Sequence, residues 1–189
     1  MRAFIAIEIP PAIKEGMAGV RDRLKSAGVD AAWSRPEGVH LTLKFLGEVG
    51  EEQVPEITRA LTIAIGDTER FRLGVEGVGV FPNPASARVV WFGLTGDVNV
   101  LVALQAAVEQ AMAGLGIESD DRPYTPHLTL GRIKRIRKRA AWLEGLAGVR
   151  NSKLPGFEVA SVSLIESQLR PSGAVYRELG RVALKDKRG

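Results

Sequence analysis

The same tetrapeptide, His-Leu-Thr-Leu, occurs twice in the chain and contains both of its histidines. The two copies are His40–Leu43 and His127–Leu130. Successive side chains of a β-strand point to opposite faces, so the His and Thr of each copy point one way and the leucines the other. Leucine prefers the core, which leaves the imidazole and the hydroxyl together on the open face. The repeat therefore predicts two strands that are anchored from behind by leucine and face one site.

The rest of the chain alternates between strand and helix patterns. We expect strands at residues 2–9, 39–46, 71–80, 88–94, 127–133, 157–166 and 175–184, and helices at 12–27, 51–65, 98–115 and 137–147. No connecting segment is long or polar enough to separate independent domains. We therefore predict an α+β fold in which residues 1–189 form one domain of two pseudo-symmetric lobes, each contributing one His-Leu-Thr-Leu strand.

Composition narrows the classes of function. The chain has no cysteine, which excludes disulfides, thiolate metal sites and cysteine nucleophiles. Its N-terminus lacks the features of a signal peptide, and no apolar run reaches the roughly 18 residues of a membrane span. We expect a cytoplasmic protein that does not associate with membranes. The formal net charge of +4 favours a polyanionic partner such as nucleic acid.

A facing pair of histidines permits a specific chemistry. The unperturbed pKa of histidine is about 6.5, so the side chain exchanges protons near neutral pH. One imidazole can act as general base and the other as general acid on opposite sides of a phosphorus centre. The hydroxyls of Thr42 and Thr129 can donate hydrogen bonds to the non-bridging phosphate oxygens. This division of roles requires no metal and no cofactor.

Two other interpretations of the histidines remain open at this point. A catalytic zinc site needs a third protein ligand, and Asp120 and Asp121 lie near the second motif, although neither has a ligand-like spacing from His127. Alternatively, both histidines are buried in strand cores and satisfied by hydrogen bonds. The matched pairing of the two motifs favours catalysis over both interpretations.

Several stretches around the two motifs resemble a known family. They are Met1–Ile7, His40–Gly47, Arg122–Arg132 and the closing positions Ser167, Leu169, Gly173 and Tyr176. Together they resemble the RNA 2′,3′-cyclic phosphodiesterase family, also called the 2′-5′ RNA ligase family, of the two-histidine phosphoesterase superfamily. The resemblance runs nearly end to end, and no catalytic position departs from the pattern.

The resemblance implies both an architecture and an activity. It implies a bilobal fold with two antiparallel sheets lining a central cleft and helices outside. It also implies hydrolysis of a terminal 2′,3′-cyclic phosphate of RNA to a 2′-phosphate, with tRNA half-molecules joined through a 2′-5′ linkage by some members. We cast His127 as the base that activates water and His40 as the acid that protonates O3′, although residue order leaves the reverse assignment open.

Residues next to the motifs are further candidates for substrate contact. Arg132 lies five residues after His127, and Gly131 can introduce a bulge that turns the guanidinium towards a phosphate. Phe45 lies five residues after His40 and is suited to stacking on a base, although strict alternation places it in the core. Alternation places Lys44 on the His40 face, where it can contact RNA. Residues 132–139 carry six positive charges and can follow an RNA backbone or simply face solvent.

Three other functions stay in consideration. The same site can act on small nucleotides, such as ADP-ribose cyclic phosphate or 2′,5′-linked oligoadenylate. The fold can also serve as a non-catalytic RNA-binding module, although two intact motifs argue against this. Ligation of tRNA halves can be the main activity instead of hydrolysis. In each case we expect the protein to act as a monomer.

Overall fold

A computed structural model of the chain describes residues 1–188. The strands are β1 (Arg2–Glu8), β2 (Val29–Trp33), β3 (His40–Glu48), β4 (Phe71–Phe81), β5 (Val89–Gly96), β6 (Leu128–Ile136), β7 (Lys153–Val159), β8 (Ser161–Arg170) and β9 (Gly173–Ala183). The α-helices are α1 (Pro11–Lys25), α2 (Val54–Ile65), α3 (Val98–Gly114) and α4 (Arg139–Val149). Within these residues, no helix is long and apolar enough to cross a membrane.

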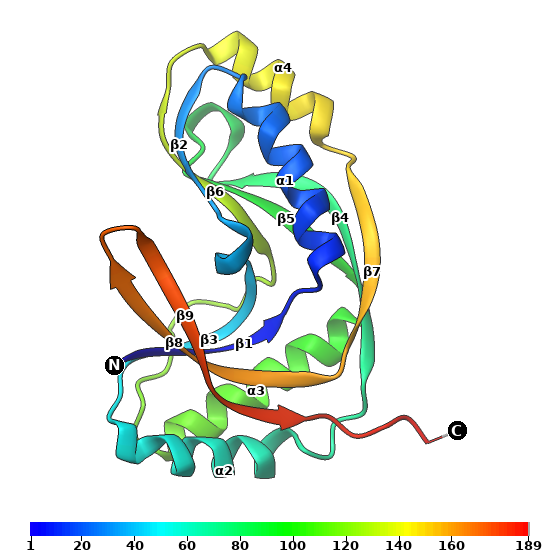
Figure 1. Cartoon of the computed structure of the whole chain (residues 1–189). Helices are drawn as coiled ribbons and strands as arrows, with labels where there is room; N and C mark the ends of the chain where they lie inside the picture. The colour runs from blue at the N-terminus through cyan, green and yellow to red at the C-terminus, as the bar shows by residue number, and fades with distance from the viewer. Residues whose placement is uncertain (189) are drawn as a thin grey trace.

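The strands form two antiparallel sheets. The first sheet has the order β3-β1-β8-β9, and the second has the order β2-β6-β5-β4-β7. Helices α2 and α3 pack on the first sheet, whereas α1 and α4 pack on the second (Figure 1). The expected α+β fold with two antiparallel sheets is confirmed, and each sheet carries one of the two histidine motifs.

Apolar spacing explains where the helices pack. Helix α1 begins with Pro11 at its first position, where a missing N–H costs nothing. Its buried residues are Ile13, Met17, Val20 and Leu24, which recur every three or four positions and form one apolar stripe. The buried residues of α3 follow the same spacing, namely Leu101, Leu104, Val108 and Met112. Each stripe fixes one helix against the back of a sheet, which leaves the other face of the sheet open.

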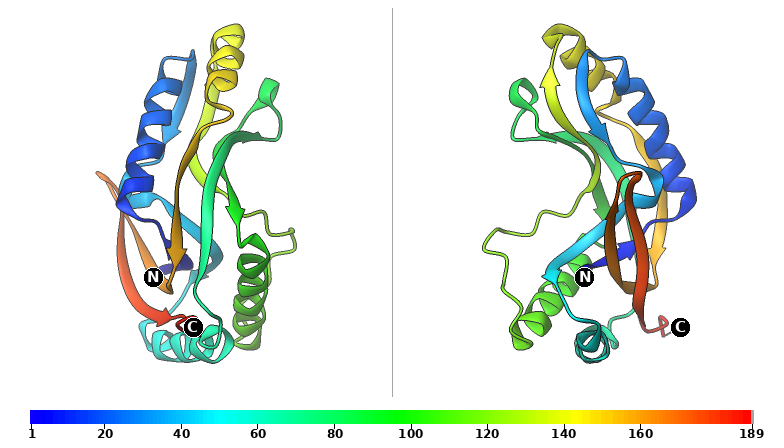
Figure 2. Two further views of the ribbon diagram at one scale, coloured as in Figure 1. Left: turned by 90° about the vertical axis from the view of Figure 1, so that its right-hand side faces the viewer. Right: turned by 60° about the vertical axis from the view of Figure 1, so that its left-hand side comes forward.

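The lobes are interleaved along the chain and are not two consecutive halves. The first sheet takes β1 and β3 from the start of the chain and β8 and β9 from its end. Strand β2 belongs to the second sheet, although it lies between β1 and β3 in sequence. The two views in Figure 2 show the N-terminal and C-terminal strands together in the same lobe.

Two strands were not predicted as such. Strand β2 is short and includes Asp30 and two alanines, so it lacks an alternating apolar pattern. Strand β7 contains Pro155 and Gly156, which usually argue against a strand, but it lies at a sheet edge where proline is tolerated. The predicted strand 157–166 is therefore wrong: it spans the end of β7 and the start of β8, with only Ala160 between the two sheets.

A β-bulge interrupts the pairing of each motif strand just after its threonine. In β3, Ala6 pairs with Thr42 and Ile5 pairs with Lys44, which leaves Leu43 unpaired. In β6, Trp91 pairs with Thr129 and Val90 pairs with Gly131, which leaves Leu130 unpaired. An extra residue reverses the alternation of all side chains that follow it. The two motif strands therefore share a second irregularity in addition to the shared tetrapeptide.

The leucines of the motifs anchor the strands to the core. Leu128 is completely buried, so we expect Leu128→Ala to lower the free energy of unfolding by about 2–5 kcal/mol, because it removes packing and leaves a cavity. Ile63 on α2 is 80% exposed, and Ile63→Ala is the matched control with an expected change within about 0.5 kcal/mol. Urea unfolding of both variants tests this, and similar losses in the two would contradict it.

Candidate active site

The two motifs meet in one cleft of about 850 Å³ between the lobes. Both histidines and both motif threonines line it, together with Arg132. A smaller recess of about 380 Å³ shares His40, both threonines and Arg132, and it is bounded by Tyr176 and Ser167 from the first sheet. The structure thus brings together the histidines and threonines of the two motifs, which are far apart in the sequence. The repeated tetrapeptide predicted that these side chains lie on the open faces of their strands.

His40 is held tightly in the first lobe. Its side chain is only 6% exposed, with Nε2 3.6 Å from a carboxylate oxygen of Glu8. The rings of Phe4 and Tyr176 pack edge-on against the imidazole, with centroids 5.4 and 5.0 Å away. Burial lowers the pKa of His40 below its ordinary value, Glu8 opposes this shift, and Lys14 adds to it. His40 is therefore a rigid group whose protonation depends on its neighbours.

His127 is more accessible and has a defined tautomer. Its Nδ1 lies 2.7 Å from the carbonyl oxygen of Thr125. A carbonyl oxygen can only accept a hydrogen bond, so Nδ1 carries the proton in the neutral ring and Nε2 keeps its lone pair. Phe81 packs edge-on against the ring at 5.4 Å. This arrangement orients His127 and leaves one nitrogen able to take up a proton.

The bulges determine which neighbours of the motifs face the cleft. After the reversal in β3, Phe45 lies on the open face, is 71% exposed and packs beside Phe4 with ring centroids 6.0 Å apart. After the reversal in β6, Arg132 lies on the open face and lines both the cleft and the recess. The bulge expected next to Gly131 is present. Phe45 and Arg132 are equivalent positions, each five residues after its histidine.

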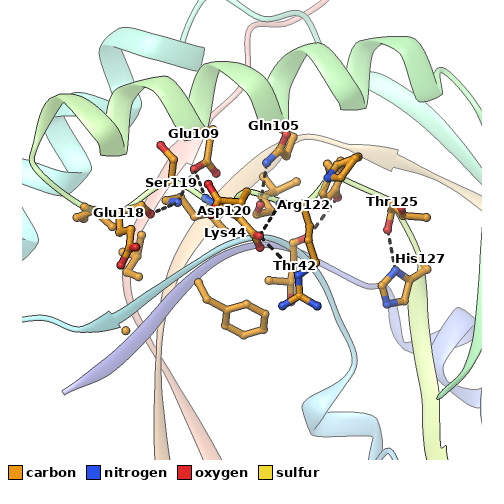
Figure 3. Close-up of a pocket in the computed structure, with 18 of the residues that line it drawn as sticks. Thr42, Lys44, Gln105, Glu109, Glu118, Ser119, Asp120, Arg122, Thr125 and His127 are labelled. Atoms are coloured by element: carbon orange, nitrogen blue, oxygen red, sulfur yellow. Dashed lines mark hydrogen bonds and ion pairs between the residues drawn. The ribbon is translucent and has the colours of Figure 1, made fainter. Parts of the chain in front are cut away.

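Lys44 does not lie on the His40 face, contrary to the alternation argument. The bulge turns it inwards, where it is 5% exposed. Its Nζ donates hydrogen bonds to Glu109 Oε1 at 2.6 Å and to the Glu118 carbonyl at 2.9 Å. Its ammonium thus joins β3, α3 and the segment that follows α3 (Figure 3). Lys44 lines the end of the cleft away from His127 (Figure 3), and contact of its ammonium with RNA would require these bonds to break.

The segment between α3 and His127 is fastened to the first lobe at several points. Glu109 Oε1 accepts a bond from the Asp120 amide at 3.1 Å, and the Tyr124 hydroxyl donates to the Thr42 carbonyl at 3.1 Å. Tyr124 is largely buried, and burial raises the pKa of its hydroxyl, which stays a donor. Within the second lobe, the Ser34 hydroxyl that follows β2 donates to the Thr129 carbonyl at 2.9 Å. The Tyr124 bond therefore ties the backbone of the first motif to the segment that leads into the second motif.

Several site residues were missed by reasoning from the residues alone. Phe4, Ser34 and Phe81 support the histidines or the threonines from neighbouring strands, and no local pattern marks them. Tyr176 was indicated only by the family resemblance. Within residues 1–188, no three histidine or carboxylate side chains form a group able to hold a metal ion. That the reaction proceeds without a metal stays a prediction.

Comparison with known proteins identifies the family. Residues 7–91 and 96–176 match the family model described as LigT-like phosphoesterase. The chain belongs to the LigT-like phosphoesterase family. It is 34% identical over 179 residues to the RNA 2′,3′-cyclic phosphodiesterase of Methanothermobacter thermautotrophicus, covering 95% of this chain and 96% of the relative. It is 36% identical over 183 residues to the protein of the same name from Archaeoglobus fulgidus, covering 95% and 98%.

Solved structures show the same fold over nearly the full length of the chain. The protein TT0787 of Thermus thermophilus aligns with a TM-score of 0.76 and 26% identity, covering 100% of both chains. E. coli LigT complexed with 3′-AMP aligns with a TM-score of 0.71 and 25% identity, covering 97% of this chain and 96% of that one. The α+β fold with two antiparallel sheets that the family resemblance implies is thereby confirmed.

The contact between Glu8 and His40 generates a direct test. The Glu8 carboxylate favours the protonated imidazole, so Glu8→Gln is expected to lower the pKa of His40 further below its ordinary value. The chain contains only two histidines, so an NMR titration resolves each ring without crowding. The titration curve of His127 serves as the internal reference. An unchanged His40 curve would contradict the proposed contact with Glu8.

Proposed function

We propose that this LigT-like phosphoesterase hydrolyses the terminal 2′,3′-cyclic phosphate of RNA to a 2′-phosphate by a paired-histidine general acid–base mechanism that uses no metal. Membership of the family makes the chain a hydrolase of phosphate esters. Three of its curated relatives are named RNA 2′,3′-cyclic phosphodiesterases. The observation that carries the proposal is that two imidazoles and two threonine hydroxyls, one of each from each lobe, line the same cleft.

In the proposed reaction, His127 acts as base and His40 as acid. Nε2 of His127 takes a proton from water as the water oxygen bonds to phosphorus. The bond between phosphorus and O3′ breaks, and O3′ receives the proton from His40. The tautomer set by Thr125 suits the base role. Glu8 and the negative charge of the bound phosphate both favour the protonated form of His40, against the effect of burial.

The remaining groups stabilise and orient the phosphate and its nucleoside. We assign the hydroxyls of Thr42 and Thr129 and the guanidinium of Arg132 to the non-bridging oxygens, where negative charge increases in the transition state. We assign Phe45 as the stacking platform for the terminal base, because its ring is exposed beside the centre. If the 5′-hydroxyl of a second RNA end replaces water, the same displacement forms a 2′-5′ linkage without a further co-reactant.

Loss of either histidine is expected to remove most of the rate. His40→Ala and His127→Ala should each lower the turnover of an RNA ending in a 2′,3′-cyclic phosphate by about 10²–10⁴-fold. The reaction is followed in excess EDTA, with identification of the product end as a 2′-phosphate. Near-normal turnover by either variant, or loss of the parent activity in EDTA, would refute the metal-free two-histidine mechanism.

Each threonine is expected to contribute less than a histidine, through its hydroxyl. Thr42→Val and Thr129→Val keep the shape of the side chain but remove the donor, so kcat should fall by about tenfold to a few hundredfold. Thr42→Ser and Thr129→Ser keep the hydroxyl and serve as matched controls. Equal losses in the Val and Ser variants would show that the methyl group matters instead.

The pH dependence of kcat, which reports groups in the enzyme–substrate complex, tests the contribution of Glu8 to the protonation of His40. A general acid must be protonated to act, so ionisation of His40 is expected to set the alkaline limb of a bell-shaped profile. Glu8→Gln lowers the pKa of His40, so the alkaline limb should move to lower pH while the acidic limb stays in place. A profile in which neither limb moves would contradict the role of Glu8 in the protonation of His40.

A further inference from the structure

The end of β6 beyond the cleft carries a group of exposed cations that the proposed reaction does not use. Lys134, Arg135 and Arg137 are all exposed. Between them, Ile133 is buried and Ile136 packs against the core. Since the isoleucines occupy the inner face, the cations extend from the open face that contains the cleft. We call the exposed residues Lys134 and Arg135, together with Arg137 directly after the strand, the basic strand end.

The local sheet pairing leaves this strand end uncovered on one side. The pairing of β6 with β5 stops at Arg132 and Val89, whereas its pairing with β2 continues to Ile136. A bulge at Lys134 interrupts the β2 pairing and places Lys134 and Arg135 next to each other as exposed residues. Arg88 adds another exposed cation to this region. It lies beside β6, because its carbonyl accepts a hydrogen bond from the Ile133 amide at 2.8 Å.

Little negative charge balances these cations. In residues 1–188, the only ion pair made by the basic strand end joins Arg137 Nη2 to Asp30 Oδ1 at 2.9 Å. Lys44 shows the opposite situation, because it is buried against Glu109. The positive charge of Lys134 and Arg135 is therefore available to an external anion.

The other end of the cleft has the opposite charge. Four carboxylates line it, namely Glu109, Glu118, Asp120 and Asp121, and only Lys44 and Arg122 stand against them. Figure 3 shows Glu109, Glu118 and Asp120 on the side of the pocket away from His127. The carboxylates repel a polyanion from the acidic end of the cleft, and β6 runs away from that end. The charge along the cleft is therefore polarised.

We propose that the basic strand end binds the phosphodiester backbone of the RNA chain on the 5′ side of the terminal cyclic phosphate. This inference rests on the proposed function. A cyclic phosphate ends its chain, so the polymer leaves the catalytic centre in one direction only. The acidic end disfavours one of the two directions, and Arg132 connects the centre to the cations in the other. From Arg132 to Ile136 the strand extends about 13 Å, which is long enough to contact more than one phosphate.

The proposal predicts a dependence on RNA length. Lys134→Gln/Arg135→Gln removes two exposed charges outside the catalytic machinery. With a ten-nucleotide RNA that ends in a 2′,3′-cyclic phosphate, kcat/KM is expected to fall on the order of tenfold at low salt, mainly through KM. With 2′,3′-cyclic AMP, which has no chain, it should stay unchanged. Lys134→Arg/Arg135→Lys keeps both charges and should restore activity on the long substrate.

A second double variant controls for net charge. Lys187→Gln/Arg188→Gln removes two exposed charges near the C-terminus and should leave both substrates unaffected. Equal losses of the strand-end variant on both substrates would show an effect on the catalytic centre and would overturn the inference. No loss on either substrate would overturn it as well, leaving these cations as ordinary solvated surface.

A binding measurement separates this inference from the proposed function. The His40→Ala/His127→Ala protein is titrated with a ten-nucleotide RNA ending in a 3′-phosphate at several salt concentrations. Adding Lys134→Gln/Arg135→Gln should reduce the slope of log K against log salt by about 1.4, since each contact with single-stranded nucleic acid contributes about 0.7. An unchanged slope overturns the inference. Absence of turnover with any cyclic phosphate refutes the proposed function, whatever the slope.

Discussion

The two-residue period of the β-strand is the constraint on which the site depends. It buries Leu41 and Leu128 while holding His40 and Thr129 at the open face. A polar group fixed in this way needs no flexible loop to position it, because the core behind the strand determines its direction. The bulge after each threonine then adds Phe45 of β3 and Arg132 of β6 to the same face. Anchoring and chemistry are therefore carried by alternate residues of the same short segments.

Sequence reasoning identified the candidate site because its signal is local and repeated. The motif spacing predicted the open faces of β3 and β6 and their convergence, and the structure shows both. It did not predict the bulge at Leu43, since a bulge depends on the partner strand and leaves no mark in a segment without glycine. The interior position of Lys44 followed from that bulge. At Gly131 the glycine provided a signal, and Arg132 was placed on the correct face.

The errors in the fold arose where tertiary context overrides the local pattern. Strands β2 and β7 pair at the two edges of the second sheet, although their own residues have little strand character. The change of sheet at Ala160 leaves the apolar pattern of residues 157–166 uninterrupted, so one strand was expected where two exist. The interleaving of the lobes depends on which strands pair at long range, and that information is not present in any short window.

The interleaved topology constrains the order in which the chain can fold during synthesis. All five strands of the second sheet have been synthesised once Val159 is added, whereas the first sheet still lacks β8 and β9. Strand β1, although first to be synthesised, lies between β3 and β8 and must keep one edge unpaired until its last partner appears. An unpaired apolar strand edge is prone to pair with other chains. The nascent protein therefore faces its greatest risk of aggregation in the lobe that contains its own N-terminus.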